Sequence, residues 1–214
     1  MTHDVKWREV TKQDKTYMQS FACTAERRRR GEIRVEYTVQ AFFRHFGIAK
    51  TNQAKDAGLD GRLLIAEDSE GIAAAYAHRL LEPDEYPQEL EVPDDCPVRD
   101  LCFLAVAERY RVAGGALFGQ TGTPGAMADE AINEALWDIR DRAPKAPRIY
   151  VTGLVDYRNI PSMRMLTRNH FDELSRGGPP PSGDNRLGRW MRILRQPTDA
   201  GAPASPGTET RSRK

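Results

Sequence analysis

The sequence has few cysteines, and those it has form no recognisable set. Cys23, Cys96 and Cys102 are the only three among 214 residues, with no CxxC pair and no histidines at zinc spacing beside them. Small secreted domains rely on several disulfides, and structural zinc sites need Cys/His clusters. The sequence therefore indicates neither a disulfide framework nor a metal site, and it fits a reducing compartment.

Long apolar runs and an excess of charge are also missing. No window of about 18 apolar residues is available to span a bilayer, and the first ten residues, MTHDVKWREV, carry charges where a signal peptide has its apolar core. Charged residues make up 29% of the chain but sum to only +1. That balance argues against a surface built throughout for nucleic acid. We therefore expect a cytoplasmic protein without membrane segments.

What the sequence does contain is an alternation of strand and helix patterns, which predicts one mixed α/β domain over residues 1–195. Residues 62–68 and 72–81, separated by a turn at 69–71, are typical of an antiparallel hairpin. Further strand patterns cover residues 5–10, 98–106, 148–156 and 186–195. Residues 196–214 are mostly small, polar or proline, and this composition predicts a disordered tail.

Two helical patterns accompany these strands. Val39, Phe42, Phe43 and Phe46 recur at helical spacing, and we interpret this stripe as core packing against the sheet. The second pattern spans residues 126–143, directly after GQTGTPG (119–125). A glycine inside a helix costs roughly 1 kcal/mol and a proline about 3 kcal/mol. The glycine-rich segment therefore predicts either a loop inserted into the helix or a late helix start.

Two charged segments have no assigned role. Residues 82–100 contain eight acidic residues and four prolines, which is typical of a loop without regular structure. The negative charge of this loop would attract a cationic amine substrate. Alternatively, the loop is a solvated lid without a role in binding. The run from Arg27 to Arg30 is either a solvated helix face or a contact for an acidic partner such as tRNA.

The most informative patterns are two places where a strand runs into a helix. At the first, strand 98–106 is followed by Arg111 and by small residues up to Ala116. Free backbone N–H groups at such a join bind phosphates, and small residues let the backbone approach them closely. At the second, strand 148–156 is followed by Asn159 and Ser162. An ordinary glycine turn and a helix N-cap are the structural alternatives at these two joins.

The two joins together resemble the GNAT acetyltransferase superfamily. The cofactor loop of that family follows Gln/Arg-x-x-Gly-x-Gly/Ala, and Arg111, Gly114 and Ala116 meet it here, five residues after the strand-ending Val106. The family then shows an Asn, a helix and Gly-Phe. Asn159 and Phe171 meet this second pattern, with His170 in place of the glycine.

The resemblance implies a largely antiparallel central sheet flanked by helices, and an N-acetyltransferase that takes acetyl-CoA as acyl donor. It also implies Asp100 as the catalytic base, near where the histone-acetyltransferase branch has a glutamate. A strand-end Asp paired with Arg99 or with solvent is the alternative. The implied cofactor-binding residues are Leu104, Ala105, Val106, Arg111, Val112, Ala113, Gly114, Gly115, Ala116 and Asn159.

Side chains around this implied site give two further expectations. Strand alternation predicts that Asp100, Cys102, Leu104 and Val106 share one face. The family often carries a proton-donating tyrosine seven residues after the Asn, and Leu166 stands there. Tyr76, Cys102 or water are then the candidate donors, unless the thiolate leaves unassisted. Two histidines, His78 beside the expected substrate side and His170, are interpreted as packed or solvated.

Three functions are consistent with these patterns. The first is an acetyl-CoA-dependent N-acyltransferase that acts on an unidentified primary amine. The second is a catalytically silent CoA-binding regulatory protein on the same fold, which Leu166 favours. The third is a nucleotide-binding protein, because GGALFGQT (114–121) nearly fits the P-loop pattern GxxxxGK[ST], with Gln120 in place of the lysine. A tRNA-linked acceptor and a homodimeric state stay open.

Overall fold

The computed structural model describes residues 5–24, 34–46, 60–110, 125–176 and 186–195. Several predicted features lie outside these ranges. They are the Arg27 to Arg30 run, the loop 111–116 with most of GQTGTPG, and the tail 196–214.

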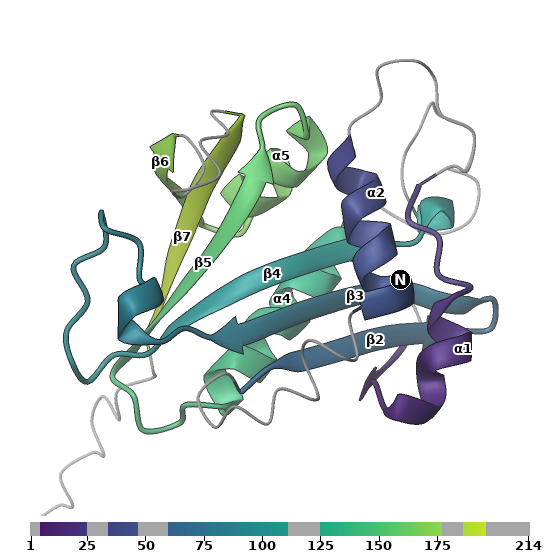
Figure 1. Ribbon diagram of the computed structural model, residues 1–214, viewed down its shortest axis with the longest axis horizontal. Coiled ribbons are helices and arrows are strands. Elements are labelled where there is room, and N and C mark those ends of the chain that lie inside the picture. The colour runs from purple at the N-terminus through teal and green to yellow at the C-terminus, as the bar shows by residue number, and fades with distance from the viewer. Residues whose placement is uncertain (1–4, 25–33, 47–59, 111–124, 177–185, 196–214) are drawn as a thin grey trace, which may run out of the picture.

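The described chain forms one seven-stranded sheet in the order β1-β2-β3-β4-β5-β7-β6, flanked by helices (Figure 1). Only β4 and β5 pair in parallel, and all other neighbours are antiparallel. The predicted mixed, largely antiparallel fold is confirmed, and β6 is the strand that the sequence patterns missed. The strands are β1 (Lys6–Glu9), β2 (Arg62–Asp68), β3 (Gly71–Leu80), β4 (Val98–Val106), β5 (Arg148–Asp156), β6 (Asp172–Arg176) and β7 (Leu187–Arg195).

Helices cover both faces of the sheet. Helix α4 (Ala126–Asp141) lies behind it, and α1 (Lys15–Met18) and α2 (Arg34–Ala41) lie in front (Figure 1). Helix α5 (Ile160–Arg168) follows β5. A π-helical turn, η2 (Phe42–Phe46), continues α2. Three short 3-10 turns are η1 (Lys12–Asp14), η3 (Pro83–Glu85) and η4 (Glu108–Tyr110).

The core on the α4 side joins α4 and α5 to the sheet. Ile132, Leu136 and Ile139 repeat at helical spacing and are buried against Val151 of β5 and Trp190 of β7. Burial of a large apolar side chain contributes roughly 1.5–3 kcal/mol. Helix α4 begins at Ala126 after Gly125, whose φ of +84° suits glycine.

The phenylalanine stripe packs on the opposite side of the sheet, as predicted. Phe42 and Phe43 are buried, and the Phe42 ring stacks on Phe103 of β4 with centroids 3.9 Å apart. Phe43 also meets Phe21 edge to face. Phe42 and Phe43 are therefore core residues, and they fix α2 above β4.

A β-bulge in β4 overturns the predicted alternation of its side chains. In the pairing with β3, Phe103 lies opposite Ala77 but Asp100 lies opposite Arg79, so β4 has one extra residue between them. A bulge shifts the side-chain period by one position. Leu104 and Val106 consequently pack on the α4 side, whereas Asp100 lies on the other face. The expectation that all four residues share a face is therefore wrong for Leu104 and Val106, whereas Asp100 and Cys102 do share one.

Asp100 is placed by its neighbour in β5. The Thr152 hydroxyl donates to the Asp100 carboxylate over 3.3 Å. Thr152 alternates with Val151, which is buried on the α4 side, so Thr152 and Asp100 both face away from α4. The sheet face that carries Asp100 is therefore the face of α1 and α2.

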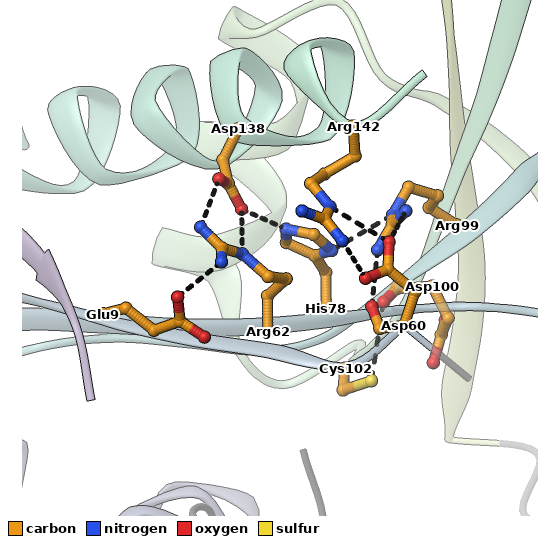
Figure 2. A network of polar contacts seen from close by, with 9 residues as sticks. All are labelled: Glu9, Asp60, Arg62, His78, Arg99, Asp100, Cys102, Asp138 and Arg142. Atoms are coloured by element: carbon orange, nitrogen blue, oxygen red, sulfur yellow. Dashed lines mark hydrogen bonds and ion pairs between the residues drawn. The ribbon is translucent and has the colours of Figure 1, made fainter. Parts of the chain in front are cut away.

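A chain of buried polar contacts ties the strands to α4 (Figure 2). His78 is fully buried and accepts at Nδ1 from Arg99 Nε, 3.2 Å away. His78 Nε2 must then carry the proton, which it donates to Asp138 Oδ2 of α4 over 2.7 Å. Burial lowers the pKa of His78 even though Asp138 acts to raise it. His78 therefore sits neutral on the α4 side, not beside the expected substrate side.

Two arginines extend this chain at its ends. Arg99, only 2% exposed, donates to the Asp60 carboxylate, which also pairs with Arg142 at the C-cap of α4. At the other end Arg62 donates to Asp138 over 2.9 Å. Arg99 is thus paired with Asp60, and the alternative that it pairs with Asp100 is not observed. A buried charge is tolerated only when it is paired and hydrogen-bonded, so this chain fixes the register of β2, β3 and β4 under α4.

Replacing Asp138 by alanine tests this network. Burial acts to raise the pKa of Asp138, but the hydrogen bonds from His78 and Arg62 outweigh it and hold the value at about 2. Asp138→Ala leaves both donors without their acceptor. We therefore expect urea denaturation at pH 7 to give a free energy of unfolding about 3 kcal/mol lower than that of wild type. Exposed Asp141 on the same helix is the control, with a change within about 0.5 kcal/mol.

The pH dependence of the same variant has a defined sign. A carboxyl whose pKa is lowered in the folded state stabilises the protein above its unfolded pKa and loses that effect as the pH falls. The stability difference between wild type and Asp138→Ala should therefore shrink as the pH falls from about 4 toward about 2. A difference that stays constant over this range would contradict the assigned network.

Candidate functional site

The candidate site begins where two neighbouring strands stop pairing. β4 and β5 pair in parallel through Val98–Asp100 and Tyr150–Thr152 only, although β4 continues to Val106 and β5 to Asp156. Beyond this point the two strands diverge (Figure 1). Each strand keeps its other neighbour, β3 or β7, along this length. The result is a split in the sheet with one strand edge on each side.

Backbone groups of β4 face this split. Ala107 N–H donates to Ala73 of β3 over 2.8 Å, so by strand alternation Ala105 and Phe103 also direct their backbone groups to β3. The N–H and C=O groups of Leu104 and Val106 then point the other way, toward β5. No backbone partner for them occurs in the described part of the chain. Edge groups of this kind bind an extended ligand as an added strand would.

The chain beyond β4 leads to the predicted phosphate loop. Arg109 donates to the Asp68 carboxylate over 2.8 Å, and the Tyr110 hydroxyl donates to the same carboxylate. These contacts anchor the approach to the loop on the β2–β3 hairpin. Arg111, Val112, Ala113, Gly114, Gly115 and Ala116 themselves lie outside the described residues.

The second join has the geometry of a capped helix. Asn159 precedes α5 and accepts a hydrogen bond from the Ser162 backbone N–H at 3.3 Å. This is the N-cap role that was one of its two interpretations. At the far end of α5, His170 has φ of +57°, a left-handed conformation that glycine adopts most easily. Phe171 behind it is buried in the core.

Asp100 lies where the split opens. It is partly exposed, so a ligand can reach it, yet protein atoms surround most of it. This burial raises the pKa of Asp100, and the nearby charges of Arg79 and Arg189 offset the effect only in part. A carboxyl with a raised pKa is suited to accept a proton near neutral pH.

Cys102, one of the candidate proton donors for the leaving thiolate, lies beside Asp100. Its thiol donates to the Asp100 backbone oxygen at 3.4 Å, and Figure 2 shows it on the side of the strands away from α4. Burial and the adjacent Asp100 carboxylate raise the pKa of Cys102. The group is therefore a protonated thiol, which is a poor nucleophile and, because its pKa is raised, a weak acid.

The donor candidate Tyr76, and two other residues near the position where the family has its proton donor, lie away from Asp100. Tyr76 is fully buried on the α4 side beside Trp7, so it is not a donor for the Asp100 face. Tyr157 lies against Gly188 and donates to Glu173 over 2.6 Å. Leu166 is buried in the core of α5.

The acidic loop is attached to the same sheet face. Tyr86, Leu90 and Val92 pack with buried Leu81 and Tyr150, next to Met191 of β7. Arg79 of β3 also forms an ion pair with Glu85 at 2.7 Å. The loop is therefore packed as a wall at one end of the Asp100 face, with most of its acidic side chains directed to solvent.

Sequence reasoning did not single out Thr152, Arg79 or Arg189. The three come from β5, β3 and β7, and only the order of the strands brings them to Asp100. The described residues contain no group of three or more His, Cys, Asp or Glu arranged to hold a metal ion. Within the same ranges, no helix has the length and apolarity needed to cross a membrane.

Comparison with known proteins identifies the fold. No family model matches the sequence, and no curated protein matches it either. Among solved structures, Arabidopsis thaliana NAA60 in complex with acetyl-CoA matches with a TM-score of 0.52, 15% identity, and coverage of 89% of this chain and 98% of NAA60. The same protein in complex with a bisubstrate analogue matches with a TM-score of 0.52 and 13% identity, and the match covers 88% of this chain and 97% of that one.

A GNAT-family acetyltransferase from Desulfovibrio desulfuricans matches more weakly, with a TM-score of 0.48, 14% identity and coverage of 89% and 98%. At such identities the likeness shows the fold alone. The chain has the fold of the GNAT acetyltransferases, as the two strand-to-helix joins predicted.

Asp100→Asn tests the electrostatics of the site. A carboxyl whose pKa is raised on folding favours the folded state at low pH, and this contribution is lost as the pH rises through the folded pKa. We therefore expect Asp100→Asn to raise Tm at pH 7.5 by about 2 °C or more, and the gain to vanish near pH 4. Exposed Asp172→Asn should change nothing. An equal Tm for Asp100→Asn and wild type at both pH values would mean that Asp100 is solvated.

Proposed function

We propose that this protein is an acetyl-CoA-dependent N-acyltransferase that transfers an acetyl group to a primary amine. The observation that carries the proposal is the split between β4 and β5, with backbone groups on one side that have no partner among the described residues and a partly exposed carboxyl of raised pKa at its base. The shared fold with acetyl-CoA-bound NAA60 supports the same conclusion.

The residues present fit acetyl-CoA. Its pantetheine arm contains two amide groups, and the edge of β4 offers backbone N–H and C=O groups of Leu104 and Val106 to pair with them. Ala105 between them is small and keeps the strand close to α2. In this proposal Arg111 and the loop through Val112, Ala113, Gly114, Gly115 and Ala116 bind the diphosphate. Asn159 would bind the arm from the β5 side.

Asp100 acts as the base. When bound, acetyl-CoA supplies a thioester whose carbonyl carbon accepts the amine. The attacking nitrogen must first lose a proton, and Asp100, with its raised pKa and partial exposure, accepts it. The Thr152 hydroxyl, 3.3 Å from the carboxylate, holds Asp100 in place.

Proton donation to the leaving thiolate has one local candidate. Cys102 lies next to Asp100 as a protonated thiol, but its raised pKa makes it a weaker acid than the thiol of CoA, so it is a poor donor for this step. The thiolate also leaves without help, since a thiol pKa near roughly 8.5 makes it a tolerable leaving group at neutral pH. Leu166 and Tyr157 have no part in this step, because one is apolar and the other is held by Glu173.

A silent CoA-binding regulator on this fold is the second candidate function. Leu166 favours it, because this buried apolar side chain replaces the donor that the family often carries on this helix. Such a protein would bind acetyl-CoA without turnover. The distinction therefore rests on measuring binding and transfer separately.

Calorimetric titration with acetyl-CoA, CoA and ATP tests cofactor binding. We expect both CoA compounds to bind and ATP not to bind. Gly114→Val should weaken the binding of acetyl-CoA at least tenfold, because a branched side chain keeps the backbone away from the diphosphate. Gly71→Ala, in the β2–β3 turn, is the control for the cost of removing a glycine elsewhere. Tight binding of ATP alone would favour the nucleotide-binding alternative, and unchanged binding by Gly114→Val would remove the loop from the site.

Turnover by Asp100→Asn tests the base. We expect the rate over an amine panel to fall about 100-fold, with the acetyl-CoA affinity unchanged. In the pH–rate profile of wild type, the rate should fall at low pH, because a protonated Asp100 accepts no proton. This decrease at low pH should be absent from the profile of the variant. Binding of acetyl-CoA with no transfer by wild type to any amine would favour the silent regulator.

A further inference from the structure

An arginine that forms no ion pair with the described residues lies on the sheet face that carries Asp100. Arg189 of β7 is in register with Leu154 of β5, and both alternate with residues of the α4-side core, Trp190 and Gly153. Arg189 therefore faces the same side as Thr152 and Asp100. It is partly exposed, and no carboxylate within the described chain pairs with it.

The surroundings of Arg189 leave its charge available. Most arginines near the sheet are engaged: Arg79 with Glu85, Arg99 with Asp60, and Arg158 with Asp156. Arg189 differs from these although its charge is close enough to Asp100 to lower the pKa of that carboxyl. A guanidinium presents five N–H donors in a fork that fits carboxylate and phosphate groups. An unpaired one facing a candidate site is suited to an anionic ligand.

The apolar neighbours of Arg189 indicate where such a ligand lies. Leu154, 40% exposed, stands beside it on β5, beyond the point where β5 separates from β4. The acidic loop closes one end of this surface through its packing on Met191. The face thus presents a carboxylate at Asp100, a cation at Arg189 and apolar contact between and beside them.

We propose that Arg189 binds an anionic group of the acceptor, so that the acceptor is an amine that also carries a carboxylate or a phosphate. Asp100 then receives the amine end and Arg189 the anionic end, which matches the opposite charges of a zwitterion. This inference rests on the proposed acetyl transfer and gives it a substrate class. A purely cationic acceptor such as a polyamine is disfavoured, because Arg189 repels it.

Initial rates with matched acceptors test the inference at saturating acetyl-CoA. Leucine is compared with isoamylamine, which lacks only the carboxylate, and O-phosphoethanolamine with ethanolamine, which lacks the phosphate. We expect wild type to prefer one anionic member by at least tenfold in kcat/KM, and the preferred pair identifies the group as carboxylate or phosphate. Arg189→Ala should raise KM for that acceptor about tenfold and leave the neutral amines within twofold.

Arg195→Ala is the matched control. Arg195 lies on the same strand and by alternation on the same face, six residues further from the split, and it is exposed. Its replacement should change neither KM nor kcat for any acceptor. Arg189→Lys should restore part of the affinity, because it keeps the charge but loses the fork.

The outcomes separate the inference from the proposed function. If wild type binds no acetyl-CoA, the proposed function fails and the inference fails with it. If wild type acetylates neutral amines as well as anionic ones, or Arg189→Ala leaves KM for the anionic acceptor unchanged, only the inference is overturned. If acetyl-CoA binds but no amine is acetylated, thermal shifts with N-acetylleucine and CoA decide. A shift that Arg189→Ala abolishes supports the anion site, and no Arg189-dependent shift overturns it.

Discussion

The short parallel contact between β4 and β5 is the constraint on which the candidate site depends. Three residues of each strand hold the two halves of the sheet together, and beyond them each strand has a partner on one side only. Backbone polar groups without partners are costly unless solvent or a ligand satisfies them. The sheet therefore offers a candidate site along its own interior edge.

The bulge in β4 decides which side chains that site receives. One additional residue between Asp100 and Phe103 turns Leu104 and Val106 into the α4-side core and leaves Asp100 on the open face with Thr152. A regular strand would place Asp100 with Leu104, against α4, where an ionised carboxyl would have no route to a substrate. The same shift in period directs the backbone of Leu104 and Val106 to the split, so the placement of Asp100 and the backbone edge are set by a single irregularity.

Buried charge on the other side of the sheet keeps this arrangement fixed. Arg99 neighbours Asp100 in sequence but points toward α4, where Asp60 neutralises it and neutral His78 links it to Asp138. Because adjacent residues of a strand point to opposite faces, the placement of Arg99 also determines that of Asp100. Stability and function thus draw on opposite faces of the same short segment. This explains why a buried, destabilising carboxyl can be kept at Asp100.

The sequence by itself determined the class of fold, the hairpin of β2 and β3, the core role of Phe42 and Phe43, the end of β4 at Val106 and the start of α5 after Asn159, because periodicity and turn chemistry are local. It did not determine the face of Asp100, since a bulge leaves no composition signal, nor β6, whose short pattern DELSR is not apolar. Only the tertiary structure decided that His78 and Tyr76 belong to the α4 side and that Arg189 joins Asp100. Those assignments depend on strand order and register, which are set by contacts between residues far apart in the chain.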